Sequence, residues 1–235
     1  MHCHILPELD DGATSMKETL EMIVAAKQYG ITNFIATPHF SQQFQNNDSE
    51  KIRSLCKKVQ KYAKEKLETD INIYPGQEIL YCDEVLERLS EGKLLTLAGS
   101  NYILLEFQPQ ISYLDIYRIV REVTMNRYFP ILAHVERYSS LQNKEKIEEL
   151  IKTGAYLQMN YYSLAGRWYK GFPRWCKKLL KEKKIHFLST DMHRINGHRT
   201  SISQPLNWLE KHLDKTYLNE ILYENAVKIL QNEKI

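Results

Sequence analysis

The N-terminal segment MHCHILPELDDG places two histidines and two aspartates within its first eleven residues. In an extended strand, residues i and i+2 share a face, so His2 and His4 would point the same way while Cys3 points to the other side. Chain termini usually fray, but a histidine pair followed by two acids has the composition of a ligand set. The segment therefore predicts the first strand of a metal site.

Ligand-type side chains also stand at or near the ends of most other apolar, β-rich runs. The sequences ATPHF, PGQEI, LLEF, AHVER and STDMH supply, in this order, His39, Glu78, Glu106, His134 with Glu136 and Arg137, and Asp191 with His193. Only the run ending in QMN offers nothing stronger than Asn160. A carboxylate after an apolar strand, such as Glu106, is costly to bury unless it is paired or metal-bound.

The hydrophobic pattern alternates short strands with amphipathic helices. Strands are expected at 2–6, 31–38, 71–76, 101–107, 128–134, 155–160 and 185–191, and helices at 15–29, 48–67, 83–89, 114–126, 144–153, 175–183, 202–213 and 217–231. Strand-then-helix units repeated about seven times indicate an α/β fold around a parallel sheet.

The distribution of ligand-type residues separates two such folds. Parallel barrels assemble their sites from residues at the ends of several strands. A doubly wound sheet concentrates them at one switch point and usually carries a glycine-rich turn, which this sequence lacks. Candidate ligands at six of seven strands therefore favour a barrel.

Nine residues form the candidate metal set. They are His2, His4, Asp11, His39, Glu78, Glu106, His134, Asp191 and His193. One open catalytic zinc takes about three protein ligands, so nine predict two or three ions, with Glu78 as a candidate bridge. Imidazole and carboxylate ligands without thiolate suit Mn, Fe or Zn. Clustered metals of this kind serve phosphoester hydrolysis, because they generate hydroxide and clamp the phosphoryl oxygens.

The length, composition and net charge of the chain are typical of a globular protein. With 235 residues, 43% hydrophobic and 26% charged, the chain suits a single globular domain, 1–235. A net charge of +3 gives no reason to expect a nucleic-acid partner. No long apolar run or leader is present, and four scattered cysteines predict free thiols, so we expect a cytoplasmic protein without a membrane span.

Several further residues have two open interpretations. Arg137 could hold a phosphate bidentately or form an ion pair with a nearby acid. The stretch 166–184 mixes cations with aromatics and could bind an anionic ligand or be a solvated helix, and Arg199 is a weaker phosphate candidate. His186 begins a strand at the end opposite the site, and His212 is expected on a solvated helix face.

The motifs HCHILP with DDG, TPH, GQE, LLEF, AHVERY and STDMH resemble the polymerase-and-histidinol-phosphatase (PHP) superfamily across essentially the whole chain. More narrowly, they are similar to the manganese-dependent protein-tyrosine phosphatases of bacterial capsule and exopolysaccharide clusters. The resemblance implies a distorted TIM-like (β/α)7 barrel with a trinuclear manganese centre. The implied substrate is phosphotyrosine on a bacterial tyrosine autokinase, and small homo-oligomers are possible within the family.

The resemblance also implies roles for individual residues. One metal would lie among His2, His4, Glu78 and Asp191, a second among Glu78, Glu106 and His134, and a third among Asp11, His39 and His193. Catalysis would involve Arg137, His134 and Asp191, with Arg137 contacting the substrate phosphate. Asp10 is expected to be a loop or capping residue. Family members carry two or three residues before the first histidine, whereas here only Met1 precedes it, so a short first strand is expected.

Two alternatives remain open from the sequence. Another PHP activity, such as histidinol-phosphate phosphatase or phosphodiesterase, would use the same fold and metals. A non-catalytic regulator could bind the kinase through the same barrel. A phosphatase using a cysteine nucleophile is disfavoured, because no C-x5-R loop is present.

Overall fold

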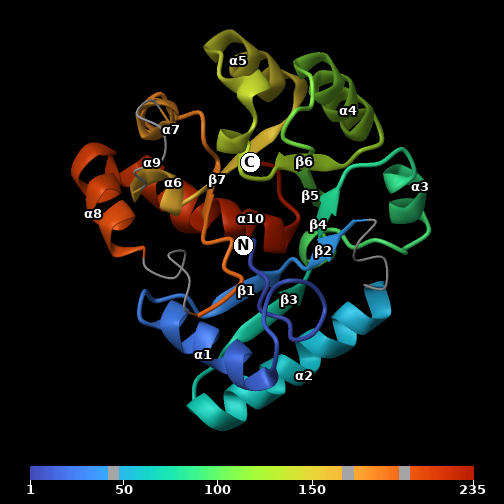
Figure 1. Cartoon of the computed structure of the whole chain (residues 1–235), viewed down its shortest axis with the longest axis vertical. Helices are drawn as coiled ribbons and strands as arrows, with labels where there is room; N and C mark the ends of the chain where they lie inside the picture. The colour runs from blue at the N-terminus through green and yellow to red at the C-terminus, as the bar shows by residue number, and fades with distance from the viewer. Residues whose placement is uncertain (42–47, 166–171, 196–201) are drawn as a thin grey trace. The chain divides into compact units, whose positions relative to one another are not determined.

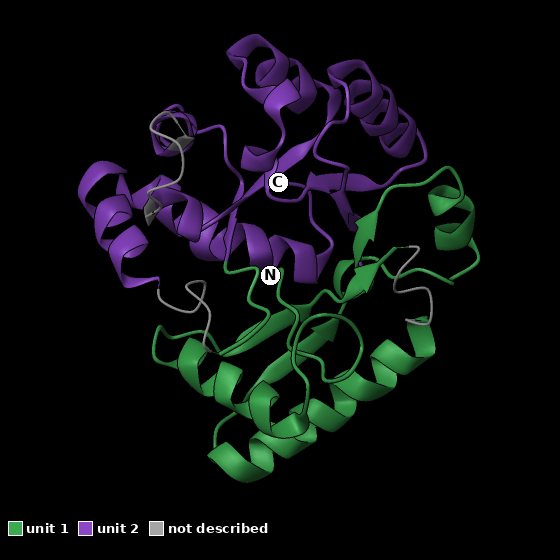
Figure 2. Ribbon diagram, in the orientation of Figure 1, with its two compact units in different colours: residues 1–99, 190–201 green, residues 100–189, 202–235 purple. Residues whose placement is uncertain are grey.

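The structure is a computed structural model and describes residues 1–41, 48–165, 172–195 and 202–235. The chain divides into two compact units, the first formed by residues 1–99 and 190–201 and the second by residues 100–189 and 202–235 (Figure 2). Every strand pair described below is parallel, as the alternation of strands and helices predicts.

Unit 1 contains two short parallel strand pairs. Strand β1 (Asn33–Ala36) pairs with β3 (Asn72–Pro75), and β2 (His39–Phe40) pairs with β4 (Glu78–Leu80). The sequence predicted one continuous strand for each of these two regions, 31–38 and 71–76. The first region instead breaks at Thr37 and Pro38 and the second at Gly76 and Gln77. The strands that follow these breaks, β2 and β4, make His39 and Glu78 register partners.

Helices α1 (Met16–Lys27), α2 (Ser49–Leu67) and α3 (Val85–Ser90) complete unit 1, with α1 beside α2 on the β1–β3 pair (Figure 1). Helix α2 buries Ile52, Cys56, Val59 and Ala63, which recur at helical spacing, in a core shared with Phe34. Asp48 caps the helix by accepting a hydrogen bond from the Lys51 backbone N–H.

Unit 2 holds a sheet in the order β5–β6–β7–β8. These strands are Tyr102–Glu106, Phe129–Leu132, Tyr156–Asn160 and Phe187–Ser189. Their helices include α4 (Tyr113–Met125), α5 (Lys144–Thr153), α6 (Tyr162–Ala165), α7 (Phe172–Lys181) and α8 (Ser203–His212) (Figure 1). The apolar side chains of β5 are almost completely buried, as parallel strands covered on both faces require.

The C-terminal helix predicted at 217–231 is interrupted. It consists of α9 (Lys215–Asn219), a π-helical turn (Glu220–Glu224) and α10 (Asn225–Gln231). In the described parts of the chain, no helix has both the length and the apolar character needed to cross a membrane.

Candidate metal centre

The first segment does not form the predicted strand at 2–6. It makes one isolated parallel bridge, between Cys3 and Met192, and His2 has a left-handed φ of 66°. Backbone bonds still hold the segment in place, because His4 N–H donates to the Met192 carbonyl (2.9 Å) and Thr37 N–H to the Cys3 carbonyl (2.9 Å). The strand geometry was therefore predicted wrongly.

The two histidine rings nevertheless converge, as predicted. The Nε2 atoms of His2 and His4 each lie 3.1 Å from the same carboxylate oxygen, Oε2 of Glu78. Asp191 Oδ1 lies 3.3 Å from His2 Nε2 and 3.5 Å from His4 Nε2. All four side chains are at most 2% exposed, so four ligand atoms share one buried point of unit 1.

A second group lies next to the first and is more open to solvent. It consists of His4, Asp11, His39 and His193. Asp11 Oδ1 is 3.3 Å from His193 Nε2 and 3.6 Å from His39 Nε2, and His39 Nδ1 is 3.2 Å from Glu78 Oε2. Glu78 therefore contacts both groups, which is the position a bridging carboxylate would require.

The donor atoms fit divalent metal ions. Metal–ligand bonds of about 2.0–2.2 Å place neighbouring ligand atoms roughly 3.0–3.5 Å apart in octahedral or tetrahedral coordination. The Nε2 atoms of His2 and His4 lie 3.1–3.5 Å from Glu78 Oε2 and Asp191 Oδ1. Two buried carboxylates without a cation would also repel each other strongly at low dielectric constant.

The pKa values in the cluster follow from these contacts. Burial alone lowers the pKa of His4, but hydrogen bonds to Asp10, Asp191 and Glu78 hold it well above the usual histidine value. Burial raises the pKa of Asp191, yet His2 and His4 outweigh this effect and keep it well below the usual range. The hydrogen bond to His193 lowers the pKa of Asp11 to about 2. Both aspartates are therefore ionised at neutral pH, the form in which they bind metals.

Asp10 has a role that the sequence did not reveal. Its Oδ2 lies 2.7 Å from His4 Nδ1 and accepts a hydrogen bond from the His39 backbone N–H (2.9 Å), while its Oδ1 accepts the Gly12 N–H (2.8 Å). The side chain is 1% exposed. A carboxylate on one nitrogen of a histidine directs the other nitrogen to the metal position. The interpretation as a loop or capping residue was incomplete, although the position of DDG shortly after the histidine pair HCH was an available signal.

Unit 2 carries the two remaining predicted ligands. His134 Nε2 lies 3.2 Å from Glu106 Oε1, and the His134 backbone N–H donates to Gln158 Oε1 at 2.6 Å. His134 follows β6 in a left-handed conformation, with a φ of 34°. Such a strained backbone in a non-glycine residue persists only where its surroundings hold it, and it is common at functional sites.

Arg137 contacts Tyr162, the first residue of α6. Its Nε and Nη2 groups donate to the Tyr162 hydroxyl at 3.2 and 2.7 Å. Its neighbour Glu136 is 1% exposed and accepts hydrogen bonds from Asn160 N–H (3.1 Å) and Ser163 Oγ (2.7 Å). Tyr162 was not predicted as part of the site. Glu136 was noted as a ligand-type residue near a strand end but was not among the nine candidate ligands.

The cysteines are free thiols, as predicted. Burial raises the pKa of Cys3 to about 11 and that of Cys56 to about 12, so neither forms the thiolate that a cysteine nucleophile requires. Arg199 and residues 166–171 of the basic–aromatic stretch lie outside the described residues. Within its described part, Lys177 lies over the Trp208 ring at 5.1 Å, and anion binding there stays a prediction.

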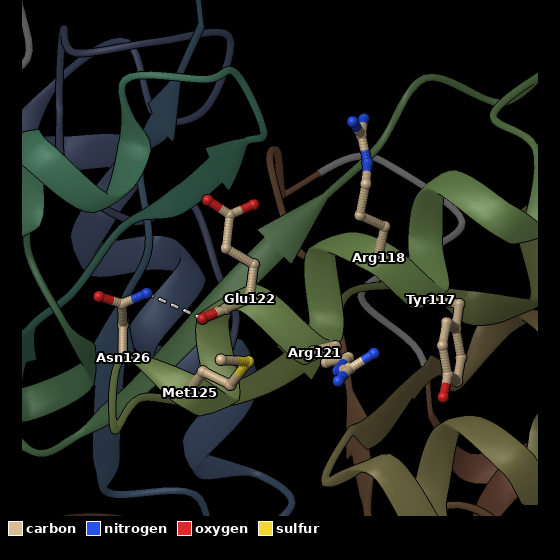
Figure 3. Close-up of a pocket in the computed structure, with 6 residues that line it drawn as sticks. All are labelled: Tyr117, Arg118, Arg121, Glu122, Met125 and Asn126. Carbon is tan, nitrogen blue, oxygen red and sulfur yellow. Dashed lines mark hydrogen bonds between the residues drawn. The ribbon is translucent and has the colours of Figure 1, made fainter.

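A surface pocket is present on α4 and contains none of the predicted ligands (Figure 3). It is lined by Tyr117, Arg118, Arg121, Glu122, Met125 and Asn126. The Asn126 side chain donates a hydrogen bond to the Glu122 backbone carbonyl and so caps the C-terminal end of α4 (Figure 3).

Comparison with known proteins decides the family. The family model described as capsular polysaccharide synthesis, CpsB/CapC, matches residues 1–231. The chain belongs to the CpsB/CapC family. As a CpsB/CapC protein, it is 32% identical to the tyrosine-protein phosphatase YwqE of Bacillus subtilis, over 100% of this chain and 92% of YwqE. It is 30% identical to the tyrosine-protein phosphatase CpsB of Streptococcus pneumoniae, over 100% of this chain and 99% of that protein.

A solved structure supports the same family. A chain from the crystal structures of YwqE and CpsB, described as unique metal-dependent tyrosine phosphatases, matches with a TM-score of 0.90 and 32% identity. The match covers 100% of this chain and 94% of that chain. It confirms the fold class predicted from the sequence, the distorted TIM-like α/β barrel of this CpsB/CapC family.

Proposed function

We propose that this protein is a metal-dependent protein-tyrosine phosphatase that acts on phosphotyrosine of a bacterial tyrosine kinase and thereby regulates capsule or exopolysaccharide synthesis. The observation that carries the proposal is the convergence of His2, His4 and Asp191 on Glu78 at ligand–ligand distances. The names of the relatives, tyrosine-protein phosphatases, support the substrate class. A cytoplasmic location follows from a kinase substrate that uses ATP.

We propose that the nine predicted ligands hold two or three Mn ions, with Fe or Zn as alternatives. His2, His4, Glu78 and Asp191 would form one site, and Asp11, His39 and His193 would contribute to another. Glu106 and His134 would supply further ligands from unit 2. When bound, these ions would supply Lewis acidity and a nucleophile at neutral pH.

The remaining residues act on the substrate and on the ligands. Asp10 fixes the tautomer of His4, so that Nε2 faces the metal position. Arg137 would bind the phosphate and stabilise the charge that develops on its oxygens, since a guanidinium matches two phosphoryl oxygens. His134 and Asp191 would complete the catalytic set by orienting the reacting groups.

The test is turnover by the Mn-loaded protein on three substrates: a phosphotyrosyl peptide, histidinol phosphate and a nucleotide phosphodiester. We expect the peptide to be hydrolysed with the largest kcat/KM and Arg137→Ala to lower that value by at least tenfold. An inert peptide combined with turnover of either other substrate would overturn the proposed substrate class. A metal-free wild-type protein, or an unchanged rate in His134→Ala, would support a non-catalytic regulator instead.

A further inference from the structure

Two hydrogen bonds connect the junction between β7 and α6 to the 3-10 turn Val135–Arg137, which carries Arg137. Glu136, within that turn, accepts hydrogen bonds from the Asn160 backbone N–H at 3.1 Å and from Ser163 Oγ at 2.7 Å. These two contacts flank Tyr162 in the sequence, and Glu136 is 1% exposed. The position of Tyr162 relative to Arg137 is therefore fixed on both sides by a buried carboxylate.

The Tyr162 hydroxyl accepts hydrogen bonds from one edge of the Arg137 guanidinium. Arg137 Nε donates to it at 3.2 Å and Nη2 at 2.7 Å, and Asn160 Nδ2 donates to the same oxygen at 3.1 Å. Two donors from one planar group to one acceptor define the orientation of the guanidinium plane. An arginine side chain otherwise has about 2 kcal/mol of rotamer entropy to lose when it becomes ordered.

Side-chain amides of β7 extend this network to His134. The His134 backbone N–H donates to Gln158 Oε1 at 2.6 Å, and Gln158 Nε2 donates to Asn160 Oδ1 at 2.7 Å. Asn160 in turn contacts Tyr162. Gln158 and Asn160 are fully buried. Strand β7, whose end offers no strong metal ligand, thus connects the proposed ligand His134 to Arg137 through side-chain hydrogen bonds.

We propose that Tyr162 is a positioning residue that orients Arg137 for the phosphate of the substrate; this inference rests on the proposed function of Arg137. The hydroxyl of Tyr162 holds the Nε–Nη2 edge of the guanidinium. The phosphate monoester then binds through the Nη1–Nη2 edge, which presents two parallel N–H donors. Tyr162 is thereby a determinant of substrate binding that does not itself contact a metal.

The test compares Tyr162→Phe with Tyr161→Phe. The latter is a matched control, because Tyr161 is adjacent and buried and its hydroxyl makes no hydrogen bond with the described residues. We expect Tyr162→Phe to lower kcat/KM on the phosphotyrosyl peptide about tenfold and Tyr161→Phe to change it less than twofold, with Mn content and melting temperature retained in both. In an Arg137→Ala background, Tyr162→Phe should cost less than twofold, since residues acting through one another are non-additive. A full tenfold loss in that background, or no loss in the wild type, would overturn the inference.

A second readout separates this inference from the proposed function. The Arg137 Nε–H signal in NMR spectra, assigned by its absence in Arg137→Lys, requires no turnover. We expect this signal to shift and to exchange faster with solvent in Tyr162→Phe but not in Tyr161→Phe. An unchanged signal in Tyr162→Phe overturns the inference whatever the activity. A Tyr162-dependent signal in a wild-type protein that leaves the peptide intact supports the orientation of Arg137 by Tyr162 and overturns the phosphatase function alone.

Discussion

Oδ2 of Asp10 lies 2.7 Å from Nδ1 of His4, and the other ring nitrogen of His4 lies 3.1 Å from Glu78 Oε2. Asp10 thus holds the His4 ring through Nδ1, and Nε2 faces the metal position. Such supporting carboxylates typically change metal affinity 10–100-fold when they are altered. Asp10 also accepts the His39 N–H, so one side chain orders two proposed ligands.

We therefore expect Asp10→Asn to weaken Mn²⁺ binding by about tenfold or more. The neutral amide no longer stabilises the His4 tautomer that carries its proton on Nδ1 and leaves Nε2 for the metal. Isothermal titration calorimetry on the metal-stripped protein measures this dissociation constant. Glu8→Gln is the control, since Glu8 is an exposed acid in the same loop. Equal affinities for the Asp10 variant and the wild type would show that the contact does not support the metal site.

The second prediction concerns Glu78, whose Oε2 contacts His2, His4 and His39. Binding a ligand at a hundred times its dissociation constant stabilises a protein by about 2.7 kcal/mol, which raises the melting temperature of a chain of this size by about 5–10 °C. We expect Mn²⁺ to produce such a rise in the wild type, EDTA to abolish it together with the activity, and Glu78→Gln to lose most of it. Thermal unfolding with and without Mn²⁺ is the measurement.

Glu87→Gln is the matched control for this prediction, because Glu87 is an exposed acid on α3. It should retain the full Mn²⁺-induced rise. A rise of the same size in Glu78→Gln would contradict a central ligand role for Glu78.

Most of the candidate ligands could be selected from the sequence because they stand at or near the end of a short apolar run, where a polar side chain is costly to bury alone. Parallel strands bring such ends to one edge, which is why His39 and Glu78, 39 positions apart, become register partners. The end of the first strand at Ala36 and the separate strand at His39–Phe40 were not predicted, because the sequence gives one apolar run up to Pro38. The strand at 2–6 was wrong because the alternation of two histidines also fits an irregular segment held by backbone bonds to its neighbours.

Residues that position the candidate site residues, such as Tyr162 and Asp10, could not be identified from the ends of apolar runs. Tyr162 and Arg137 are 25 positions apart and meet through a hydroxyl, a group with no required partner in the sequence pattern. Asp10 and Asp11 are chemically identical neighbours, and only the backbone path of the DDG turn decides which one faces His4. Side-chain networks of this kind depend on loop conformation, which hydrophobic periodicity does not encode.

Gly12 provides a third prediction, because the backbone of the DDG turn packs directly on His4. A Cβ at position 12 would lie 2.2 Å from the His4 carbonyl oxygen and 2.6 Å from the His4 Cβ. We expect Gly12→Ala to lower the free energy of unfolding by about 2–3 kcal/mol, as overpacking of a tight contact does, and to weaken Mn²⁺ binding by displacing His4. Urea denaturation and metal titration measure both effects.

Gly92→Ala is the control for Gly12. Gly92 has a left-handed φ of 70°, and nothing lies within 4 Å of the position of an added Cβ. Its replacement should cost about 1 kcal/mol from backbone strain alone and should leave metal binding unchanged. Comparable losses of stability and of Mn²⁺ affinity in the two variants would contradict the close approach at Gly12.

The last prediction uses His186, which directly precedes β8 and is not among the proposed ligands. Its Nδ1 accepts a hydrogen bond from the Leu157 backbone N–H (3.0 Å), and its ring packs edge-on against Tyr156. Burial lowers the pKa of His186 from 6.5 to about 4. Between these pH values the unfolded chain binds the additional proton, so the free energy of unfolding decreases as the pH falls from about 6.5 towards 4.

We expect this residue to account for about 1–2 kcal/mol of the stability lost between pH 7 and pH 4.5. His186→Asn, whose side-chain oxygen can accept the same backbone hydrogen bond, should lack this part of the loss. Urea denaturation of the metal-stripped proteins at both pH values gives the difference, with His212→Asn on the exposed end of α8 as the control. If His186→Asn and the wild type lose equal stability on acidification, the neutral, buried state of His186 does not contribute to the pH dependence of folding.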